Sequence, residues 1–253
     1  MRGRVAVVTG AGAGVGRAVA LRLVADDHAE TVVVNDIDPE RAKAVADEVE
    51  AGGGRGIPAV ADVTVWDEVV EMMGLVAKDA GGVEILVNNA GVPLGQHTGV
   101  PFASSDPEEW QPWLMLSLFG VMYCTRAALP SMLDGGWGRI VTVVSDAGRV
   151  GEAGMTAYAT AKAGAAGFTR SISREVGKAG ITANNVALGA IKHGPLGELM
   201  TGDFERRLLK QYRVGRLGTP EDAAAMISFL SSADAAWITG QTYPVNGGYS
   251  VTQ

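Results

Sequence analysis

The sequence predicts an α/β fold of the Rossmann type, a doubly wound sheet of seven mainly parallel strands with helices on both faces. Short runs rich in valine and isoleucine alternate with longer helical patterns along the whole chain of 253 residues. Most of these runs are apolar throughout, which is typical of strands that are covered on both faces. The alternation itself favours parallel strands joined by right-handed helical crossovers.

The predicted elements follow one another without an internal repeat or a low-complexity linker. The strands are Arg4–Val8, Thr31–Asn35, Ile57–Ala61, Glu84–Asn88, Arg139–Val144, Ile181–Val186 and Gln241–Val245. The helical segments are 15–26, 39–50, 65–79, 107–131, 157–177 and 220–231. Asp38, Asp106 and Thr219 each precede a proline and acidic residues, so we expect them to cap the helices that follow.

We expect residues 1–253 to form one domain, with one unusual stretch at about 190–216. That stretch combines glycine, proline and methionine with a basic helical piece, Phe204–Tyr212. An insertion of this kind is typical of a lid over a bound ligand.

Composition excludes several classes of protein. A net charge of −7 argues against a nucleic-acid partner, which requires clustered positive charge. The apolar run after the basic start is too short for a secretory signal. We find no continuous apolar stretch that would span a bilayer, so we expect no membrane association. The single cysteine, Cys124, cannot form an internal disulfide, which favours the cytoplasm. We expect no metal site.

A glycine-rich segment, Thr9–Gly16, lies between the first strand and the first helix. Glycines let the backbone approach a pyrophosphate, and a helix N-terminus offers free N–H groups and a positive dipole end. The alternative is a tight turn with nothing bound. The pattern is T-G-x-x-x-G-x-G, and the residues expected to contact a dinucleotide here are Gly10, Gly12, Gly14, Val15 and Gly16.

Asp36 directly follows the second predicted strand, 20 residues after Gly16. A carboxylate there can accept both ribose hydroxyls and would repel a 2′-phosphate. Neither Ala13 nor Ile37 is basic, and a basic residue at either position could neutralise such a phosphate. We therefore predict NAD rather than NADP, with Ile37 also beside the cofactor. The alternative for Asp36 is a solvated loop acid.

Tyr158 and Lys162 stand four residues apart, on one face of a predicted helix. A phenol with a pKa near 10 is a poor base at neutral pH. A neighbouring ammonium group and a positive nicotinamide ring favour the phenolate and make Tyr158 a usable acid and base. The pair alone is unspecific, because most such pairs are surface neighbours.

Over essentially its whole length the chain resembles the classical short-chain dehydrogenase/reductase family. The matching segments are Thr9–Gly16, Asp62-Val63, Asn88–Gly91, Ser145 at 13 residues before Tyr158, the Tyr158/Lys162 pair, Gly218–Asp222 and Ile238–Gln241. They occur in the family's order and at its spacing, which makes the resemblance specific.

The resemblance implies a role for each matching residue. Ser145 would hydrogen-bond the substrate oxygen, Tyr158 would exchange its proton, and Lys162 would hold the nicotinamide ribose and lower the pKa of Tyr158. Cofactor contacts are implied for Asp62 and Val63 at the adenine, for Asn89, Ala90 and Gly91 along the cofactor, and for Gly189 and Ile191 near the carboxamide.

Three positions depart from the family pattern. Ser117 replaces an asparagine whose carbonyl supports a water-mediated proton relay to the lysine, so the relay is in doubt while Ser117 stays a candidate catalytic residue. Leu188 replaces the usual proline before Gly189. His193 stands where a threonine generally touches the cofactor, and it either contacts pyrophosphate or substrate or serves only the conformation of the lid.

The resemblance implies an NAD-dependent oxidoreductase that interconverts a secondary alcohol and a ketone. The substrate is a small molecule, and a steroid-like alcohol or a 3-hydroxyacyl/3-oxoacyl thioester is favoured. The alternative is a catalytically impaired dinucleotide-binding protein with a regulatory or scaffold role. Family members usually form tetramers through helices corresponding to 107–131 and 157–177 and through the last strand, so we expect a homotetramer or a homodimer.

Overall fold

The computed structural model describes residues 3–93, 99–192 and 201–251. One seven-stranded sheet runs through them, in the order β3-β2-β1-β4-β5-β6-β7. The strands are β1 (Val5–Thr9), β2 (Thr31–Asp36), β3 (Arg55–Val60), β4 (Ile85–Asn88), β5 (Gly138–Ser145), β6 (Ile181–Leu188) and β7 (Thr242–Val245). Every neighbouring pair is parallel. The predicted α/β fold is therefore confirmed.

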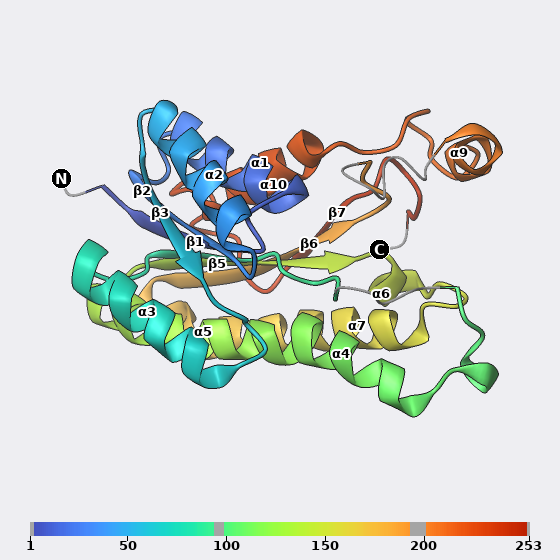
Figure 1. The fold of residues 1–253 in the computed structure, drawn as a ribbon, viewed down its shortest axis with the longest axis horizontal. Helices are drawn as coiled ribbons and strands as arrows, with labels where there is room; N and C mark the ends of the chain where they lie inside the picture. Colours follow the sequence, from blue (N-terminus) through green and yellow to red (C-terminus); the bar gives the residue numbers. More distant parts are fainter. Residues whose placement is uncertain (1–2, 94–98, 193–200, 252–253) are drawn as a thin grey trace.

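Helices cover both faces of the sheet. The helices are α1 (Gly14–Ala25), α2 (Pro39–Ala51), α3 (Trp66–Ala80), α4 (Trp110–Leu114), α5 (Gly120–Gly135), α6 (Ala147–Val150), α7 (Thr156–Val176), α9 (Gly202–Leu209) and α10 (Pro220–Ser231). Figure 1 shows α1, α2 and α10 on one face and α3, α4, α5 and α7 on the other. The short α6 and the helix α9 lie at one end of the sheet, near the C-terminus.

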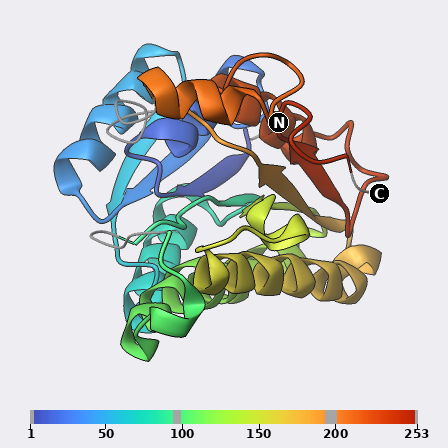
Figure 2. The same ribbon diagram turned by 90° about the vertical axis from the view of Figure 1, so that its right-hand side faces the viewer.

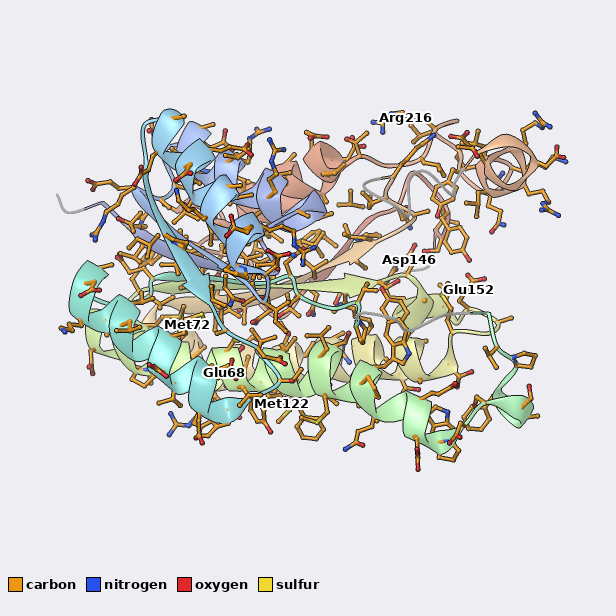
Figure 3. All side chains as sticks on the ribbon, in the orientation of Figure 1. Glu68, Met72, Met122, Asp146, Glu152 and Arg216 are labelled. Atoms are coloured by element: carbon orange, nitrogen blue, oxygen red, sulfur yellow. The ribbon has the colours of Figure 1, made fainter. Side chains whose placement is uncertain are left out.

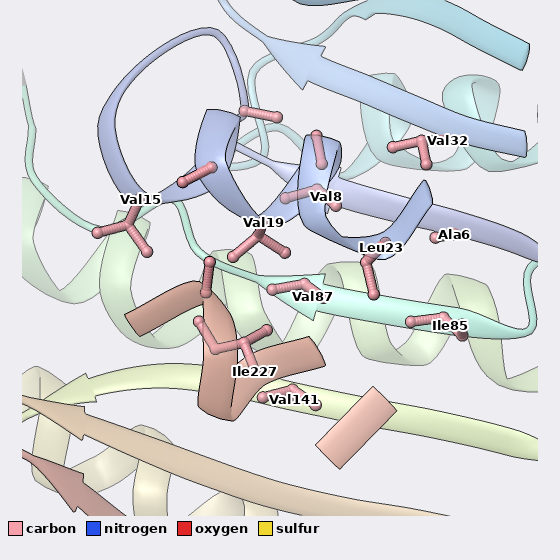
Figure 4. Close-up of a cluster of buried hydrophobic side chains, with 14 of the residues drawn as sticks. Ala6, Val8, Val15, Val19, Leu23, Val32, Ile85, Val87, Val141 and Ile227 are labelled. Atoms are coloured by element: carbon pink, nitrogen blue, oxygen red, sulfur yellow. The ribbon is translucent and has the colours of Figure 1, made fainter. Parts of the chain in front are cut away.

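The core has one layer on each side of the sheet, because side chains alternate between the two faces of a strand. On β1, Ala6 and Val8 belong to the cluster beneath α1 and α10, while Val5 and Val7 belong to the cluster above α3 and α5. Figure 4 shows the first cluster, in which Leu23 of α1 and other side chains pack on the strands. Burying a leucine side chain completely stabilises the fold by about 2 kcal/mol.

The three predicted helix caps are formed. Asp38 accepts hydrogen bonds from Glu40 N and Arg41 N, and Asp106 accepts one from Glu108 N. Thr219 begins a capping box at α10. Capping side chains satisfy amide groups that the first turn leaves without helical partners.

The segment predicted as one helix over 107–131 is interrupted. A π-helical turn, Met115–Phe119, separates α4 from α5. A π turn carries one extra residue per turn, which a 3.6-residue periodicity does not reveal. Ser117 lies inside this turn.

The helical run Pro107–Gly135 has the length and mean hydropathy, 1.2, of a membrane-crossing helix, which the sequence analysis did not anticipate. Polar residues interrupt the run, so it contains no long continuous apolar stretch. Its buried side includes Val121, Cys124 and Ala128, which pack beneath the sheet. Because core helices of water-soluble proteins pass the same test, the run is weak support for a membrane span.

Candidate active site

The predicted site residues gather at the carboxyl ends of the strands, where ligands bind in open parallel sheets. Chain order reverses between β1 and β4, which are neighbours in the sheet although β2 and β3 intervene in sequence. The glycine-rich turn follows β1, Asn89 follows β4, and Ser145 ends β5. Figure 2 shows α6 and α7 beside β5, the strand that carries Ser145.

The glycine-rich turn approaches its neighbours so closely that side chains are excluded. Gly10 and Gly14 adopt the left-handed region with φ of 60° and 54°, which favours glycine. A Cβ on Gly16 would lie 2.3 Å from the carbonyl oxygen of Gly10. Ala13 provides no side-chain cap for α1, so amides of its first turn remain free to bind an anion. The turn therefore fits a dinucleotide pyrophosphate.

Asn89 fastens this turn to the end of β4. Its Nδ2 donates to the carbonyl oxygens of Thr9 at 2.9 Å and Gly10 at 3.0 Å. Thr9 Oγ1 in return accepts from the amides of Asn89 and Ala90. The asparagine thus shapes the cradle through its side chain.

Asp36 is buried at the end of β2, next to the glycine-rich turn. Its Oδ2 accepts from Gly12 N at 3.0 Å, and its Oδ1 lies 3.2 Å from Arg41 Nη2. Arg41 belongs to the first turn of α2, and sequence reasoning missed it because only Ala13 and Ile37 were considered. A Cβ on Gly12 would lie 2.7 Å from both Asp36 Oδ2 and Arg41 Cβ. The carboxylate therefore has a basic neighbour at the point where a ribose would bind.

Asp62 and Val63, the residues expected at the adenine, lie between β3 and α3. Asp62 Oδ1 accepts from the amide and hydroxyl of Thr64, both at 2.8 Å, so this oxygen stabilises the turn before α3. Val63 is buried in the core, and Ile37 is 52% exposed. Asp62 itself is partly exposed.

Ser145 and Tyr158 are hydrogen-bonded through their side chains. Ser145 Oγ also accepts from Ala147 N at 3.2 Å. Burial raises the pKa of the Tyr158 phenol, and the Ser145 hydrogen bond acts in the opposite direction. The ring of Trp113 packs edge-on against Tyr158, with centroids 5.2 Å apart. The phenol is therefore held in one position and protonated in the free protein.

Lys162 is buried one helical turn beyond Tyr158. Its Nζ donates to the carbonyl oxygen of Val143 at 2.9 Å and lies 5.9 Å from the centre of the Tyr158 ring. Burial lowers the pKa of Lys162 to about 8. A Cβ on Gly91 would lie 2.3 Å from Nζ, so the Gly91 backbone forms the wall of the lysine site.

Comparisons with known proteins agree with this geometry. The family model described as short chain dehydrogenase matches residues 4–201. The chain belongs to the short-chain dehydrogenase family. It is therefore an oxidoreductase of a family that binds nicotinamide dinucleotides and acts on CH–OH groups.

Three relatives illustrate the range of this family. The chain is 38% identical over 99% of its length to (2S)-[(R)-hydroxy(phenyl)methyl]succinyl-CoA dehydrogenase subunit BbsD of Thauera aromatica, covering 98% of that protein. It is 32% identical to 7alpha-hydroxysteroid dehydrogenase of Escherichia coli K12, covering 97% of this chain and 94% of that one. It is 37% identical to 3-oxoacyl-[acyl-carrier-protein] reductase FabG of Pseudomonas aeruginosa, covering 98% of both.

In this short-chain dehydrogenase, Ser117 lies in the π-helical turn and is fully buried. Its Oγ donates to the carbonyl oxygen of Gly91 at 2.8 Å. Because Gly91 also borders Lys162 Nζ, the serine is connected to the lysine through one glycine backbone. The hydroxyl thus fixes the wall of the lysine site, a role that sequence spacing did not suggest.

The segment after β6 turns back toward the site. Gly189 N donates to Val245 O at 3.2 Å, and Ala190 N donates to the hydroxyl of Tyr212 at 2.7 Å. Ile191 is buried and pairs with Gly218 through a β-bridge, and its side chain packs into the core. His193 lies outside the described residues.

Proposed function

We propose that this protein is an NAD-dependent dehydrogenase/reductase that interconverts a secondary alcohol and a ketone. The observation that supports this proposal most directly is the convergence of Ser145, Tyr158 and Lys162. Ser145 and Tyr158 share a hydrogen bond, and Lys162 is buried one turn away on the same helix. Buried titratable groups with shifted pKa values are typical of catalytic sites.

A bound nicotinamide ring would accept or donate the hydride. The side chains of the protein bind the substrate oxygen and transfer its proton. Ser145 Oγ hydrogen-bonds the substrate oxygen, as it hydrogen-bonds Tyr158 in the free protein. Tyr158 Oη takes the hydroxyl proton during oxidation and returns one during reduction. Lys162 Nζ holds the ribose, and its charge favours the phenolate. Ser117 holds Gly91 against the lysine. The other cofactor contacts that we propose from sequence are Gly10, Gly12, Gly14, Val15, Gly16, Asp36, Ile37, Asp62, Val63, Asn89, Ala90, Gly91, Gly189 and Ile191.

For the substrate we propose a 3-hydroxyacyl or 3-oxoacyl thioester, with a steroid-like alcohol as the second candidate. Relatives named for a CoA thioester, an acyl-carrier-protein thioester and a hydroxysteroid support both classes. The exposed residues Arg207, Lys210 and Arg213 on and after α9 favour the first, because a phosphate-bearing carrier would meet these basic side chains within the proposed lid.

The proposed function is tested with 3-hydroxyacyl-CoA esters, hydroxysteroids and simple cyclic alcohols, each with NAD⁺ and NADP⁺. We expect NADH absorbance to rise with a member of the first or second group. The rival, a dinucleotide-binding scaffold, predicts tight NADH binding by fluorescence and no turnover of any class. The hydrogen-bonded Ser145 and Tyr158 argue against that rival.

We propose NAD as the cofactor, because the Asp36 carboxylate lies against the glycine-rich turn, beside the proposed ribose position. Arg41 reduces the repulsion of a 2′-phosphate, since its guanidinium lies 3.2 Å from Asp36. Asp36→Ala is expected to shift the ratio of kcat/KM for NADP⁺ over NAD⁺ by about 100-fold, near 3 kcal/mol. In the double variant Asp36→Ala/Arg41→Ala most of this gain should disappear. Equal use of both cofactors by the parent would contradict the assignment.

We propose a homotetramer in the cytoplasm. An apolar hollow on the outer side of α5 and α7, lined by Phe119, Met122, Leu129 and Phe168 among others, supports burial against a second copy. Figure 3 shows Met122 on the side of this layer away from the sheet. Trp237, which is 99% exposed, supports a second contact near β7. Buried Cys124, the single cysteine, is compatible with a reducing compartment. We expect light scattering to give a tetramer mass.

A further inference from the structure

Asp146 follows Ser145 directly, and its carboxylate is buried although the proposed chemistry does not use it. It is 1% exposed. Its Oδ1 accepts from Arg149 Nη1 at 2.5 Å, and its Oδ2 accepts from Asn246 Nδ2 at 2.5 Å and from Ser250 Oγ at 2.9 Å. A buried carboxylate is costly unless such partners surround it. Figure 3 shows Asp146 and Glu152 together beyond the end of β5.

Two of these partners come from the C-terminal segment, Asn246–Ser250, about a hundred residues away in sequence. Asn246 Nδ2 also donates to Ser250 O at 3.0 Å, so the segment folds back over Asp146. Arg149 Nη1 donates to Ser250 Oγ at 3.1 Å. Farther along, the Tyr249 hydroxyl donates to the Glu152 carboxylate. The segment is therefore attached to both ends of the loop that follows Ser145.

The opposite side of the same loop presses on the catalytic helix. A Cβ on Gly148, in α6, would lie 2.9 Å from Ala163 N and 3.1 Å from Lys162 Cβ. Ala147, the first residue of α6, donates its amide to Ser145 Oγ. The short helix thus sits between the C-terminal segment and the turn of α7 that bears Tyr158 and Lys162.

We propose that Asp146 is a positioning residue: by fastening Asn246–Ser250 to α6, it fixes the Ser145 hydroxyl relative to Tyr158. The inference rests on the proposed function, because it concerns the turnover step. Loosening the contact lets Ser145 Oγ move away from Tyr158. The hydrogen bond that lowers the pKa of the phenol is then weakened, so alcohol oxidation requires a higher pH. The segment makes no contact with the glycine-rich turn among the contacts of the described residues, and Lys162 Nζ is held separately by the carbonyl oxygen of Val143, so we expect cofactor affinity to be preserved.

Swapping the carboxylate of Asp146 and the amide of Asn246, first in one position and then in both, tests this role. Asn246→Asp sets two carboxylates against each other and is expected to lower kcat by about 10-fold or more and to raise the midpoint of the pH profile for oxidation. KM and the Kd for NADH should stay within about twofold. Asp146→Asn/Asn246→Asp restores one carboxylate–amide pair and should return kcat to within about threefold of the parent, with the parent's pH midpoint.

Asp26→Asn is the matched control. Asp26 accepts from an arginine, Arg22 Nε at 2.6 Å, and from a serine hydroxyl, Ser228 Oγ at 2.7 Å, as Asp146 does, but it joins α1 to α10. The Asp26→Asn variant should have a lower melting temperature than the parent, with kcat and the pH profile unchanged. The proposal is overturned if Asn246→Asp keeps the parent's kcat and pH profile, or if the control loses as much activity.

Hydrogen exchange separates this inference from the proposed function. Asn246→Asp should increase amide exchange over Ala147–Val150, and the double variant should reverse the increase. Hydrogen exchange needs no substrate. The measurement therefore tests the role of Asp146 even if the parent protein turns over no substrate and the proposed function fails. Unchanged exchange over α6 would show that the C-terminal segment does not hold it, and would overturn the proposal.

Discussion

Tyr158→Phe is expected to lower kcat by about 10³-fold while the Kd for NADH stays within about twofold. The change removes only the hydroxyl that exchanges a proton with the substrate, and such a group contributes about 10² to 10⁴ in rate. A factor of 10³ corresponds to about 4 kcal/mol of transition-state stabilisation. The phenylalanine ring retains the edge-on contact with Trp113, so the fold around it should persist. Steady-state kinetics and fluorescence titration with NADH provide the two measurements.

Tyr243→Phe serves as the control for that variant. Tyr243 lies in β7 and packs against the core beneath α10, away from Ser145. We expect its kinetics to match those of the parent. If Tyr158→Phe retained the parent's turnover, proton exchange by Tyr158 would be excluded and the scaffold alternative would gain support.

Much of the fold could be predicted because it is encoded locally. The strands are apolar runs, and the residues that cap helices at Asp38, Asp106 and Thr219 precede prolines. That Tyr158 and Lys162 share one face of a helix follows from their spacing of four residues, and their roles follow from the family resemblance of the surrounding segments. These features depend on a few consecutive residues and on the 3.6-residue period, so tertiary contacts were not needed to find them.

The contacts that adjust the site could not be predicted in the same way. The π turn at Ser117 inserts a residue without changing composition. Arg41 reaches Asp36 from another element, and Asn246 reaches Asp146 across about a hundred residues. Side chains meet in these cases because two distant segments are folded together, and one sequence without the structure does not reveal the pairing. Charged residues of this kind resemble solvated surface residues in sequence.

Lys162→Met is expected to separate stability from activity. Burial lowers the pKa of Lys162 from its ordinary 10.5 to about 8. Between these values the unfolded chain holds one more proton than the folded chain, so the free energy of unfolding rises with pH. Below the folded pKa both states are protonated, and the cost of burying the ammonium is fully present. The parent should therefore gain about 2 kcal/mol relative to Lys162→Met between about pH 7.5 and about pH 10.

Denaturant unfolding at several pH values measures this gain. Lys178→Met is the matched control, because it removes an exposed lysine in the turn that follows α7. Tyr158 has a raised pKa and acts in the opposite direction at the alkaline end, but it is present in both proteins and its contribution largely cancels. Lys162→Met should at the same time lower kcat by about 10²-fold, because the ribose contact and the charge near Tyr158 are lost. A flat difference in stability across this pH range would mean that the lysine is solvated in solution. The expected slope would instead show that the fold keeps a destabilising ammonium where Tyr158 needs it.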